Sequence, residues 1–307
     1  MKKMISLMLV LVLALSLLTA CGGSSKSDLK AIKDAGKIVV GITDYAPMDY
    51  KDENGEWTGF DAEFAQLFAK ELGVDCEFFV ISDWGKKFLE LETKQIDAVW
   101  NGMTITEEAK LNASVSDAYV INAQVLVMKA DVIANYADAA SIADLAVAVE
   151  NGSAGQSAAE EAGVKNIILV QDQGAALMEV AAGTSDACVI DITMANAMTG
   201  EGTSYADLTS GLALTSEEYG VAFRKESDLT AKFNEFMDKI AADGTLQALA
   251  DKYSLTLAGY FSRLHTNTRE SRRLSLVFVC SLEISRPESG CTCQPVPAEY
   301  RQLRSCP

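Results

Sequence analysis

The sequence predicts an α/β protein with two mainly parallel sheets. Segments typical of strands and of helices alternate from residue 37 onward, which is the pattern of parallel β-α-β units. After residues 123–130 the alternation starts a second time, and this restart predicts a second sheet. A long helical stretch at 227–254 closes the pattern, and the hydrophobic content of 49% is ample for a core in a chain of 307 residues.

The first half of the pattern begins with a strand at 37–42 (KIVVGI). An amphipathic helix follows, because apolar residues recur at helical spacing on one face. These residues are Phe60, Phe64, Leu67, Phe68 and Leu72. A strand at 76–81, a helix at 83–93 that Ser82 is suited to cap, and a strand at 96–100 complete this half.

The second half repeats the arrangement. Strands are expected at 145–149, 166–170 and 186–190, with helices between them at 155–163 and 174–183. The segments 90–101 and 179–191 resemble each other, since each places an Asp-Ala pair seven residues after a Glu. Two similar lobes follow from this pattern. Ligands of open α/β sheets bind beyond the carboxyl ends of the strands, so two such edges facing each other would form a cleft.

The charge of the chain excludes some functions. The net charge of −17 argues against nucleic acid as a partner, because phosphates require Lys and Arg. Before residue 259 the sequence has no His, no clustered metal ligands and no phosphate-binding loop motif. We therefore expect no cofactor and no metal.

The N-terminus is typical of an exported protein. Residues 1–20 combine a basic start, an apolar run and small residues, which indicates a secretory signal. The segment LLTACGGSS resembles the lipobox of bacterial lipoproteins and makes Cys21 the expected lipidation site, with residues 21–36 as a tether. This implies an extracytoplasmic protein held on the cell membrane by lipid. The alternative is an ordinary signal with a chance Cys.

The C-terminal residues 259–307 differ from the rest. They hold seven Arg and no Lys, whereas residues 1–258 hold 18 Lys and only Arg224. We interpret this tail as foreign to the domain or disordered, since it has no sustained helix or strand period. Without tail and signal, 39 acidic and 17 basic residues remain, a net charge of −22. Cys76 and Cys188 are expected to be buried free thiols in different lobes.

Five ordered blocks resemble the polar amino-acid solute-binding proteins of ABC importers, and the likeness covers about residues 36–256. The blocks begin at VGITDYAPMDY, SDWGKKF, AVAVENGSAGQSA, GTSDACVIDIT and EYGVAFRKESD. The resemblance implies a type II periplasmic-binding-protein fold that closes on a small polar amino acid or analogue and delivers it to a membrane permease as a monomer. One lobe is expected from 37–125 and 217–258, and the other from 126–216. The connecting strands are expected near 122–128 and 212–222.

The resemblance also implies the ligand contacts. Tyr45 and Trp84 would sandwich the ligand side chain, and Asp191 would take its α-ammonium group. The first lobe would further contribute Asn101, Gly102 and Thr104. The second would contribute Gly152, Ser153 and Ala154 at a helix N-terminus, which suits a carboxylate. The alternatives are structural: a turn residue for Tyr45, core packing for Trp84, and helix capping for Thr104 and Asp191.

One position departs from the family. The Arg that grips the ligand's α-carboxylate falls on Ala109, and Lys110 lies one residue out of register. Either backbone N–H groups near Thr104 and Ser153 bind the carboxylate, with Lys110 as an additional contact, or the ligand lacks an ordinary α-carboxylate. Ile42 stands where some members place an Asp, which argues mildly against a Lys- or Arg-type ligand.

Two other functions remain open. The fold also resembles that of some secreted dehydratases and peptidoglycan lyases, so an enzyme is a second interpretation. With no His before the tail, such an enzyme would depend on carboxylates such as Glu150 or Asp191. A ligand-sensing domain is the third interpretation.

Overall fold

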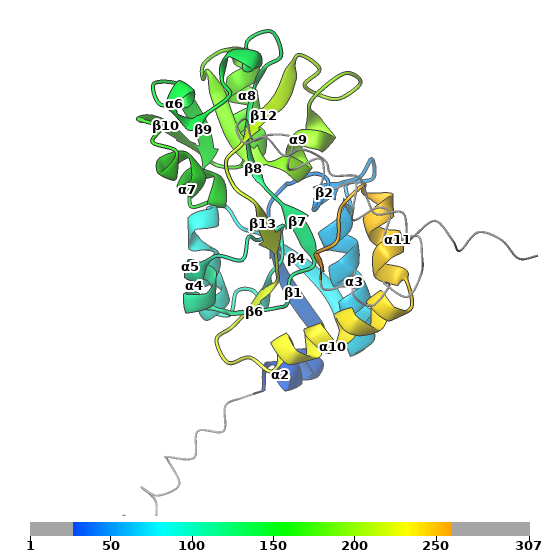
Figure 1. The fold of residues 1–307 in the computed structure, drawn as a ribbon. Coiled ribbons are helices and arrows are strands. Elements are labelled where there is room, and N and C mark those ends of the chain that lie inside the picture. The colour runs from blue at the N-terminus through cyan, green and yellow to red at the C-terminus, as the bar shows by residue number, and fades with distance from the viewer. Residues whose placement is uncertain (1–26, 260–307) are drawn as a thin grey trace, which may run out of the picture. The chain divides into compact units, whose positions relative to one another are not determined.

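The computed structural model describes residues 27–259, which form two lobes, each built on a five-stranded sheet (Figure 1). The expected signal peptide, Cys21 and residues 260–307 of the expected tail lie outside the described residues. The two-lobed α/β fold is therefore confirmed for the described part of the chain.

The sheet of lobe 1 has the strand order β4-β1-β5-β14-β6. Its first three strands pair in parallel, and β14 pairs antiparallel with both of its neighbours. The strands span Lys37–Ile42 (β1), Asp75–Val80 (β4), Ala98–Val99 (β5), Ser114–Val115 (β6) and Ala222–Phe223 (β14), and a small hairpin adds Tyr50–Lys51 (β2) and Trp57–Thr58 (β3).

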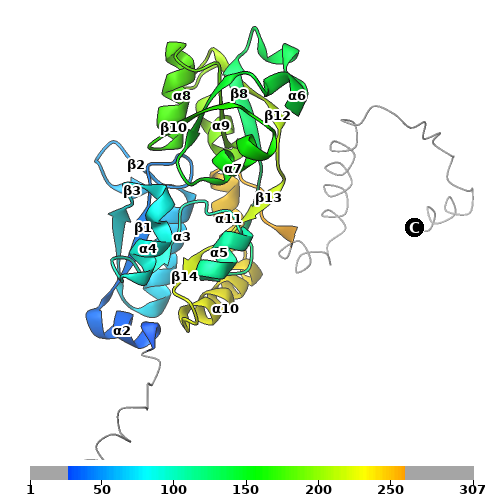
Figure 2. The same cartoon turned by 90° about the vertical axis from the view of Figure 1, so that its left-hand side faces the viewer.

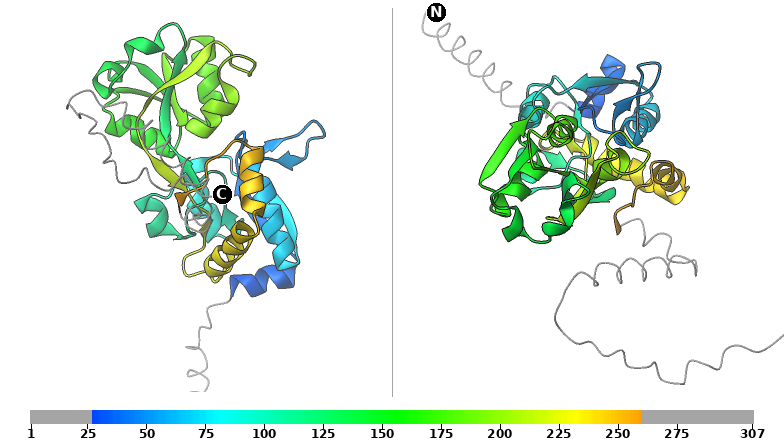
Figure 3. Two further views of the ribbon diagram at one scale, coloured as in Figure 1. Left: turned by 45° about the vertical axis from the view of Figure 1, so that its right-hand side comes forward. Right: turned by 90° about the horizontal axis from the view of Figure 1, so that it is seen from above.

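An aromatic core holds the helices of lobe 1 to this sheet. The helix α3 (Phe60–Leu72) packs against α10 (Leu229–Ala242) and α11 (Thr245–Lys252), which Figure 3 shows beside it. The ring centroids of Phe64 and Trp100 lie 5.0 Å apart, and those of Trp100 and Phe233 4.9 Å apart. Edge-to-face packing of this kind stabilises beyond the buried area alone.

Over residues 27–259, lobe 1 has four further helices, one before α3 in the sequence and three between α3 and α10. They are α2 (Asp28–Ala35), the 3₁₀ helix η1 (Trp84–Lys86), α4 (Lys87–Glu92) and α5 (Glu107–Asn112). The helix α2 lies at the end of the lobe where β1 begins (Figure 2). It falls within the segment 21–36 that was expected to be only a tether, so that prediction is corrected for residues 28–35.

Lobe 2 repeats the same plan with the strand order β10-β9-β11-β8-β12. Its strands are Gln124–Lys129 (β8), Ala146–Glu150 (β9), Asn166–Val170 (β10), Ala187–Asp191 (β11) and Leu208–Ala213 (β12). Its helices are η2 (Ile133–Asn135), α6 (Ala139–Ile142), α7 (Ala154–Glu161), α8 (Gln173–Ala182) and α9 (Ile192–Met198). Alternate residues of β9 face different helices, because Val147 and Val149 belong to the cluster of α7, whereas Ala148 belongs to that of α8. Burial on both faces explains why this strand is an unbroken apolar run.

Both sheets are mixed rather than mainly parallel, with two parallel and two antiparallel pairings each. The antiparallel strands belong to the segments that pass between the lobes. There, β7 (Val120–Asn122) and β13 (Glu217–Tyr219) pair antiparallel as a two-stranded connection (Figure 1). Strand β13 lies within the expected return segment 212–222, and β7 begins two residues before the first crossover expected at 122–128.

Two smaller predictions are also corrected. The side chain of Asp83, not Ser82, caps η1 by accepting a hydrogen bond from the Gly85 N–H at 3.1 Å. The thiols of Cys76 and Cys188 are free and lie in different lobes, but only Cys188 is fully buried. Cys76 is half-buried because β4 is the edge strand of its sheet.

Candidate functional site

A cavity of about 330 Å³ opens between the lobes and is lined by residues from both. The ends of strands and the N-termini of helices from both lobes meet at this cavity. Eight of the ten residues expected to contact a ligand line this cavity: Trp84, Asn101, Gly102, Thr104, Gly152, Ser153, Ala154 and Asp191. Tyr45 and Lys110 are not among its lining residues.

Trp84 and Lys87 form one part of the lobe 1 wall. Trp84 is the first residue of η1 and is 7% exposed. Three residues later, Lys87 lies on the same side, with its Nζ 5.0 Å from the centre of the Trp84 ring. The ammonium group donates to the carbonyl oxygen of Trp84 at 3.3 Å and to that of Gly152 in lobe 2 at 3.1 Å. No carboxylate of the described residues forms an ion pair with Lys87. Within the described residues, this buried ammonium group therefore contacts two carbonyl oxygens and the rings of Trp84 and Phe88.

The rest of the lobe 1 wall follows strand β5. The Asn101 side chain is occupied by Thr43, whose backbone N–H and hydroxyl it bonds at 2.7 Å each. Gly102 adopts a left-handed conformation with φ +56°, and its N–H donates to the buried carboxylate of Asp61. The Thr104 hydroxyl donates to Glu217 Oε1 at 2.8 Å. The side chain of Asn101 is already hydrogen-bonded to Thr43, so a ligand contact of Asn101 would involve its backbone.

The lobe 2 wall is the start of helix α7. Ser153 caps this helix by accepting a hydrogen bond from the Gln156 N–H at 3.1 Å. Gly152, at φ +71°, passes so close to lobe 1 that a Cβ placed on it would lie 2.5 Å from the Cα of Gly85. Asn151 Nδ2 donates to Asp83 Oδ1 at 3.0 Å beside this contact. The two lobes therefore touch through a glycine–glycine contact and a side-chain hydrogen bond.

Asp191 lies at the floor of the cavity and is 5% exposed. Its carboxylate accepts hydrogen bonds from Gln124 Nε2 at 2.8 Å and Tyr219 Oη at 2.8 Å, and also from Asn122 and Gln173. Burial, together with the neighbouring Glu217, raises the pKa of Asp191 to about 7, although the hydrogen bonds from Tyr219, Gln173 and Gln124 lower it. Asp191 is the residue immediately before α9, but its side chain makes no capping hydrogen bond to that helix.

Glu150 is a second buried carboxyl group at the cavity, and it is 4% exposed. Burial and the nearby Asp191 and Asp172 raise the pKa of Glu150 to about 8, although Lys87 and a hydrogen bond from Gln173 lower it. Its Oε1 atom makes no hydrogen bond with the protein. The parallel register of β9 and β11 places Glu150 and Asp191 at neighbouring strand ends.

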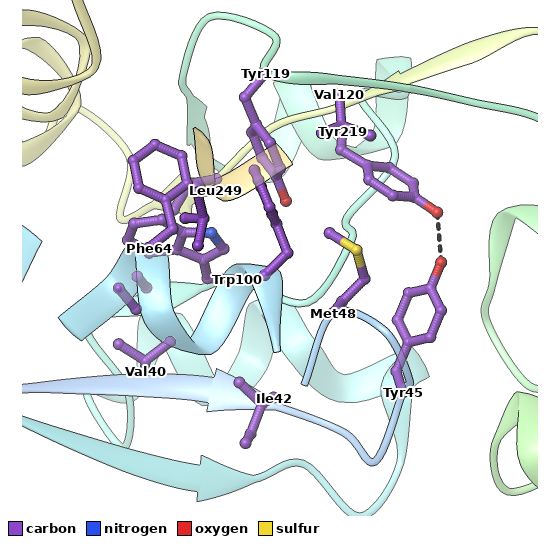
Figure 4. Close-up of a cluster of buried hydrophobic side chains, with 14 of the residues drawn as sticks. Val40, Ile42, Tyr45, Met48, Phe64, Trp100, Tyr119, Val120, Tyr219 and Leu249 are labelled. Atoms are coloured by element: carbon purple, nitrogen blue, oxygen red, sulfur yellow. Dashed lines mark hydrogen bonds between the residues drawn. The ribbon is translucent and has the colours of Figure 1, made fainter. Parts of the chain in front are cut away.

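Tyr45 and Lys110 lie elsewhere. Tyr45 is 2% exposed, and its hydroxyl bonds that of Tyr219 (Figure 4). It also bonds the hydroxyl of Thr193. Its ring packs against Gly102: a Cβ atom added to Gly102 would lie 2.6 Å from Cε1 of Tyr45. In this arrangement Tyr45 supports the cavity wall. Lys110 pairs at 2.8 Å with Glu107, and its side chain is 53% exposed. Successive residues of an α-helix are rotated by about 100° around its axis. Because Ala109 faces the core, Lys110 faces the solvent.

Neither Ala109 nor Arg224 supplies a cation to the cavity. Ala109 is 1% exposed and packs in the cluster that contains Trp84 and Met103. Arg224 forms ion pairs with Asp28 at 3.0 Å and Asp97 at 2.8 Å on the far side of β14, where it links α2 to the sheet. Among the described residues that line the cavity, Lys87 is the single basic side chain, against five acidic ones.

Sequence reasoning gave no ligand role to Lys87, and it considered Glu150 only for catalysis. Both carried a usable signal. Lys87 follows Trp84 by three residues in a helical segment, which puts the two on one face. Glu150 is the last residue of a strand just before a helix start, the position where α/β sheets place ligand contacts.

Residues 27–259 contain no group of three or more metal-ligating side chains suited to hold an ion. Within the same range, no helix has the length and apolar character needed to cross a membrane.

Two α/β lobes that share a polar cavity and are joined by two strands have the architecture of a solute-binding protein that closes on its ligand. The chain belongs to the bacterial extracellular solute-binding proteins, family 3, whose model matches residues 38–256.

Curated relatives support this class. The chain is 30% identical over 269 residues to the ABC transporter glutamine-binding protein GlnH of Bacillus subtilis, covering 82% of this chain and 97% of the relative. It is 32% identical over 265 residues to the arginine-binding extracellular protein ArtP of the same organism, covering 82% and 98%. The chain is thus the substrate-binding component of an ABC transporter.

Solved structures agree with the fold. A mutant of the arginine-binding protein of T. maritima superposes with a TM-score of 0.69 at 31% identity, covering 74% of this chain and 98% of that one. An ancestral amino acid-binding protein, described as a precursor of cyclohexadienyl dehydratase, gives a TM-score of 0.68 at 33% identity, covering 74% and 99%.

Proposed function

We propose that this protein captures an amino acid in the cavity between its lobes and delivers it to the permease of an ABC importer. The observation that carries the proposal is a 330 Å³ polar cavity whose walls come from both lobes. A ligand that contacts both walls binds the closed form better than the open one, which couples binding to closure.

The proposed contacts divide by charge. The face of Trp84 covers apolar atoms of the ligand, and Asp191 attracts its α-ammonium group. The four protein donors already at Asp191 are neutral, so a charged ammonium group is suited to replace one of them.

The carboxylate of the ligand is proposed to lie between Lys87 and the first N–H groups of α7, near Ser153, with Thr104 as a further donor. Lys87, in place of Lys110, is then the basic side chain that contacts the ligand carboxylate. The ammonium of Lys87 is close enough to Gly152 to reach this helix end, because it bonds the carbonyl oxygen one residue before Ser153.

We further propose that lipidated Cys21 anchors the protein on the outer side of the cell membrane as a monomer. The support is the lipobox-like sequence LLTAC followed by a Gly/Ser segment. Metabolic labelling with a fatty-acid analogue, with Cys21→Ser as the control, tests the anchor.

A second candidate function is an enzyme of the dehydratase type. Two buried carboxyl groups with raised pKa at one cavity are a pattern found in acid–base catalysis, and one structural neighbour is an ancestor of a dehydratase. Mass spectrometry of each bound ligand after incubation distinguishes the two, since a binding protein returns its ligand unchanged.

The deciding experiment is a thermal-shift screen of the mature protein against the twenty amino acids. A ligand that binds only the folded state increases the free energy of unfolding by mass action, by about 2.7 kcal/mol at 100 times Kd, and so raises the melting temperature. Trp84→Ala is expected to weaken binding by ~1–3 kcal/mol, and Asp191→Asn by about 2 kcal/mol or more. Absence of any amino-acid hit, or full affinity in the Asp191 variant, contradicts the proposal.

A further inference from the structure

The Glu150 carboxyl group is the one feature of the cavity that the proposed contacts leave unexplained. Glu150 lines the cavity and is 4% exposed, and its buried Oε1 atom has no hydrogen-bond partner in the protein. A buried polar atom without a partner costs about 1–3 kcal/mol. Such a group in a ligand cavity therefore indicates a contact that the bound molecule completes.

The charges around Glu150 define that contact. Asp191 on β11 and Asp172 at the start of α8 are acidic, and Lys87 on α4 is the basic group that faces it. Lys87 already bonds two carbonyl oxygens and forms no ion pair with Glu150. Two acidic groups and one basic group thus surround the free oxygen, and this net negative environment favours a cationic donor over a neutral or anionic one.

We infer that Glu150 is a specificity residue that binds a second cationic group of the ligand, so that the preferred ligand is a basic amino acid. This inference rests on the proposed function, in which Asp191 attracts the α-ammonium group. The presence of Ile42 where some family members have an Asp argued mildly against a basic ligand. Ile42 is fully buried, however, and the negative charge at the cavity comes from lobe 2 instead.

The protonation of Glu150 supports this assignment. Its pKa of about 8 means that the empty site holds a proton near neutral pH. An arriving cation favours the ionised form, so binding is expected to release a proton. Isothermal calorimetry in buffers of different ionisation enthalpy measures this release directly.

The test compares arginine with citrulline, which has nearly the same shape but a neutral side chain. Wild-type protein is expected to bind arginine at least about tenfold tighter than citrulline, or ~1.4 kcal/mol. Glu150→Gln keeps the shape of the side chain and removes its charge, so the ratio should fall to about threefold or less. Glu201→Gln, an exposed position in the same lobe, removes an equal charge and should leave the ratio unchanged.

The outcomes separate the two claims. Equal wild-type affinity for arginine and citrulline, or an unchanged ratio in Glu150→Gln, overturns the inference while an amino-acid-binding function stands. The wild-type comparison holds even if a variant folds poorly, and thermal melting of each variant checks folding. Failure of all twenty amino acids to bind overturns the proposed function and this inference with it.

Discussion

Three buried carboxyl groups should make the stability of the ligand-free protein depend on pH. Burial raises the pKa of Asp61 and Asp191 from 3.8 to about 7, and that of Glu150 from 4.5 to about 8. The folded state therefore binds more protons than the unfolded state across this range. The contribution of these protonated carboxyl groups to the free energy of unfolding is fully present below about pH 4, and it is lost as the pH rises to about 8.

We expect the melting temperature without ligand to fall by about 5 °C or more between pH 5.5 and pH 8. Carboxyl groups with lowered pKa, such as Glu63 and Asp228, titrate below this window and do not oppose the trend. Glu150→Gln should flatten the profile, whereas Glu201→Gln should not. A melting temperature that rises with pH in the wild-type protein would contradict the assignment.

Lys87 is expected to recognise the carboxylate of the ligand. Lys87→Met keeps most of the apolar stem and removes the charge, so it should weaken binding of an amino acid by about tenfold or more. Binding of the matching decarboxylated amine should change little, because that ligand carries no carboxylate. Parallel titrations of arginine and agmatine measure the difference.

Lys70→Met, an exposed position on α3, is the control for loss of one positive charge. If Lys87→Met weakens both ligands equally, Lys87 acts by holding the lobes together through Gly152 and not by binding the carboxylate.

At the scale of elements, the entry to α7 sets how closely the lobes approach. Gly152 has φ +71°, and a Cβ there would lie 2.5 Å from Gly85 Cα and 2.9 Å from Gly85 N. These atoms belong to the backbone of η1, which cannot move aside like a side chain. Only a residue without a Cβ allows this contact between the lobes.

Gly152→Ala should therefore impede closure and weaken ligand binding by about tenfold or more. Gly183→Ala is a matched control, because Gly183 has φ +76° and its Cβ would meet no atom within 4 Å. Both variants carry the backbone strain of ~1 kcal/mol, but only the first blocks the lobe contact. Calorimetry with a ligand found in the screen compares them, and equal losses of affinity would show that closure does not require this contact.

At the scale of the molecule, β7 and β13 form the connection about which the lobes are expected to move. The pair carries Asn122 and Glu217, whose side chains bond each other at 2.7 Å beside Asp191. The connection and the floor of the cavity are thus parts of one hydrogen-bond network. A ligand that binds Asp191 contacts the same groups that hold the connecting strands.

Ligand binding is expected to reduce the radius of gyration, since it favours the closed form. Small-angle X-ray scattering with and without a saturating ligand measures the change. Asp191→Asn at the same ligand concentration serves as the non-binding control. An unchanged radius in the saturated wild-type protein would show that binding does not depend on hinge closure.

The sequence by itself determined the alternation of strands and helices and the restart that divides the chain into two lobes. These follow from local rules: apolar periods near 2 and 3.6 define the elements, and parallel strands present their carboxyl ends at one edge. The resemblance of its sequence blocks to the solute-binding family placed Trp84, Gly102, Ser153 and Asp191 in the site. In the structure Trp84 begins η1, Ser153 caps α7 and Asp191 ends β11.

Only the tertiary structure decided which charges face the cavity. Lys110 and Lys87 are both helical residues next to predicted contacts, yet one pairs with Glu107 in solvent and the other is buried against lobe 2. Tyr45 bonds Tyr219 through its hydroxyl and does not line the cavity, whereas Glu150 lines it and has a carboxyl oxygen without a partner. Burial and pairing depend on atoms brought together from distant parts of the chain, so no local period in the sequence encodes them.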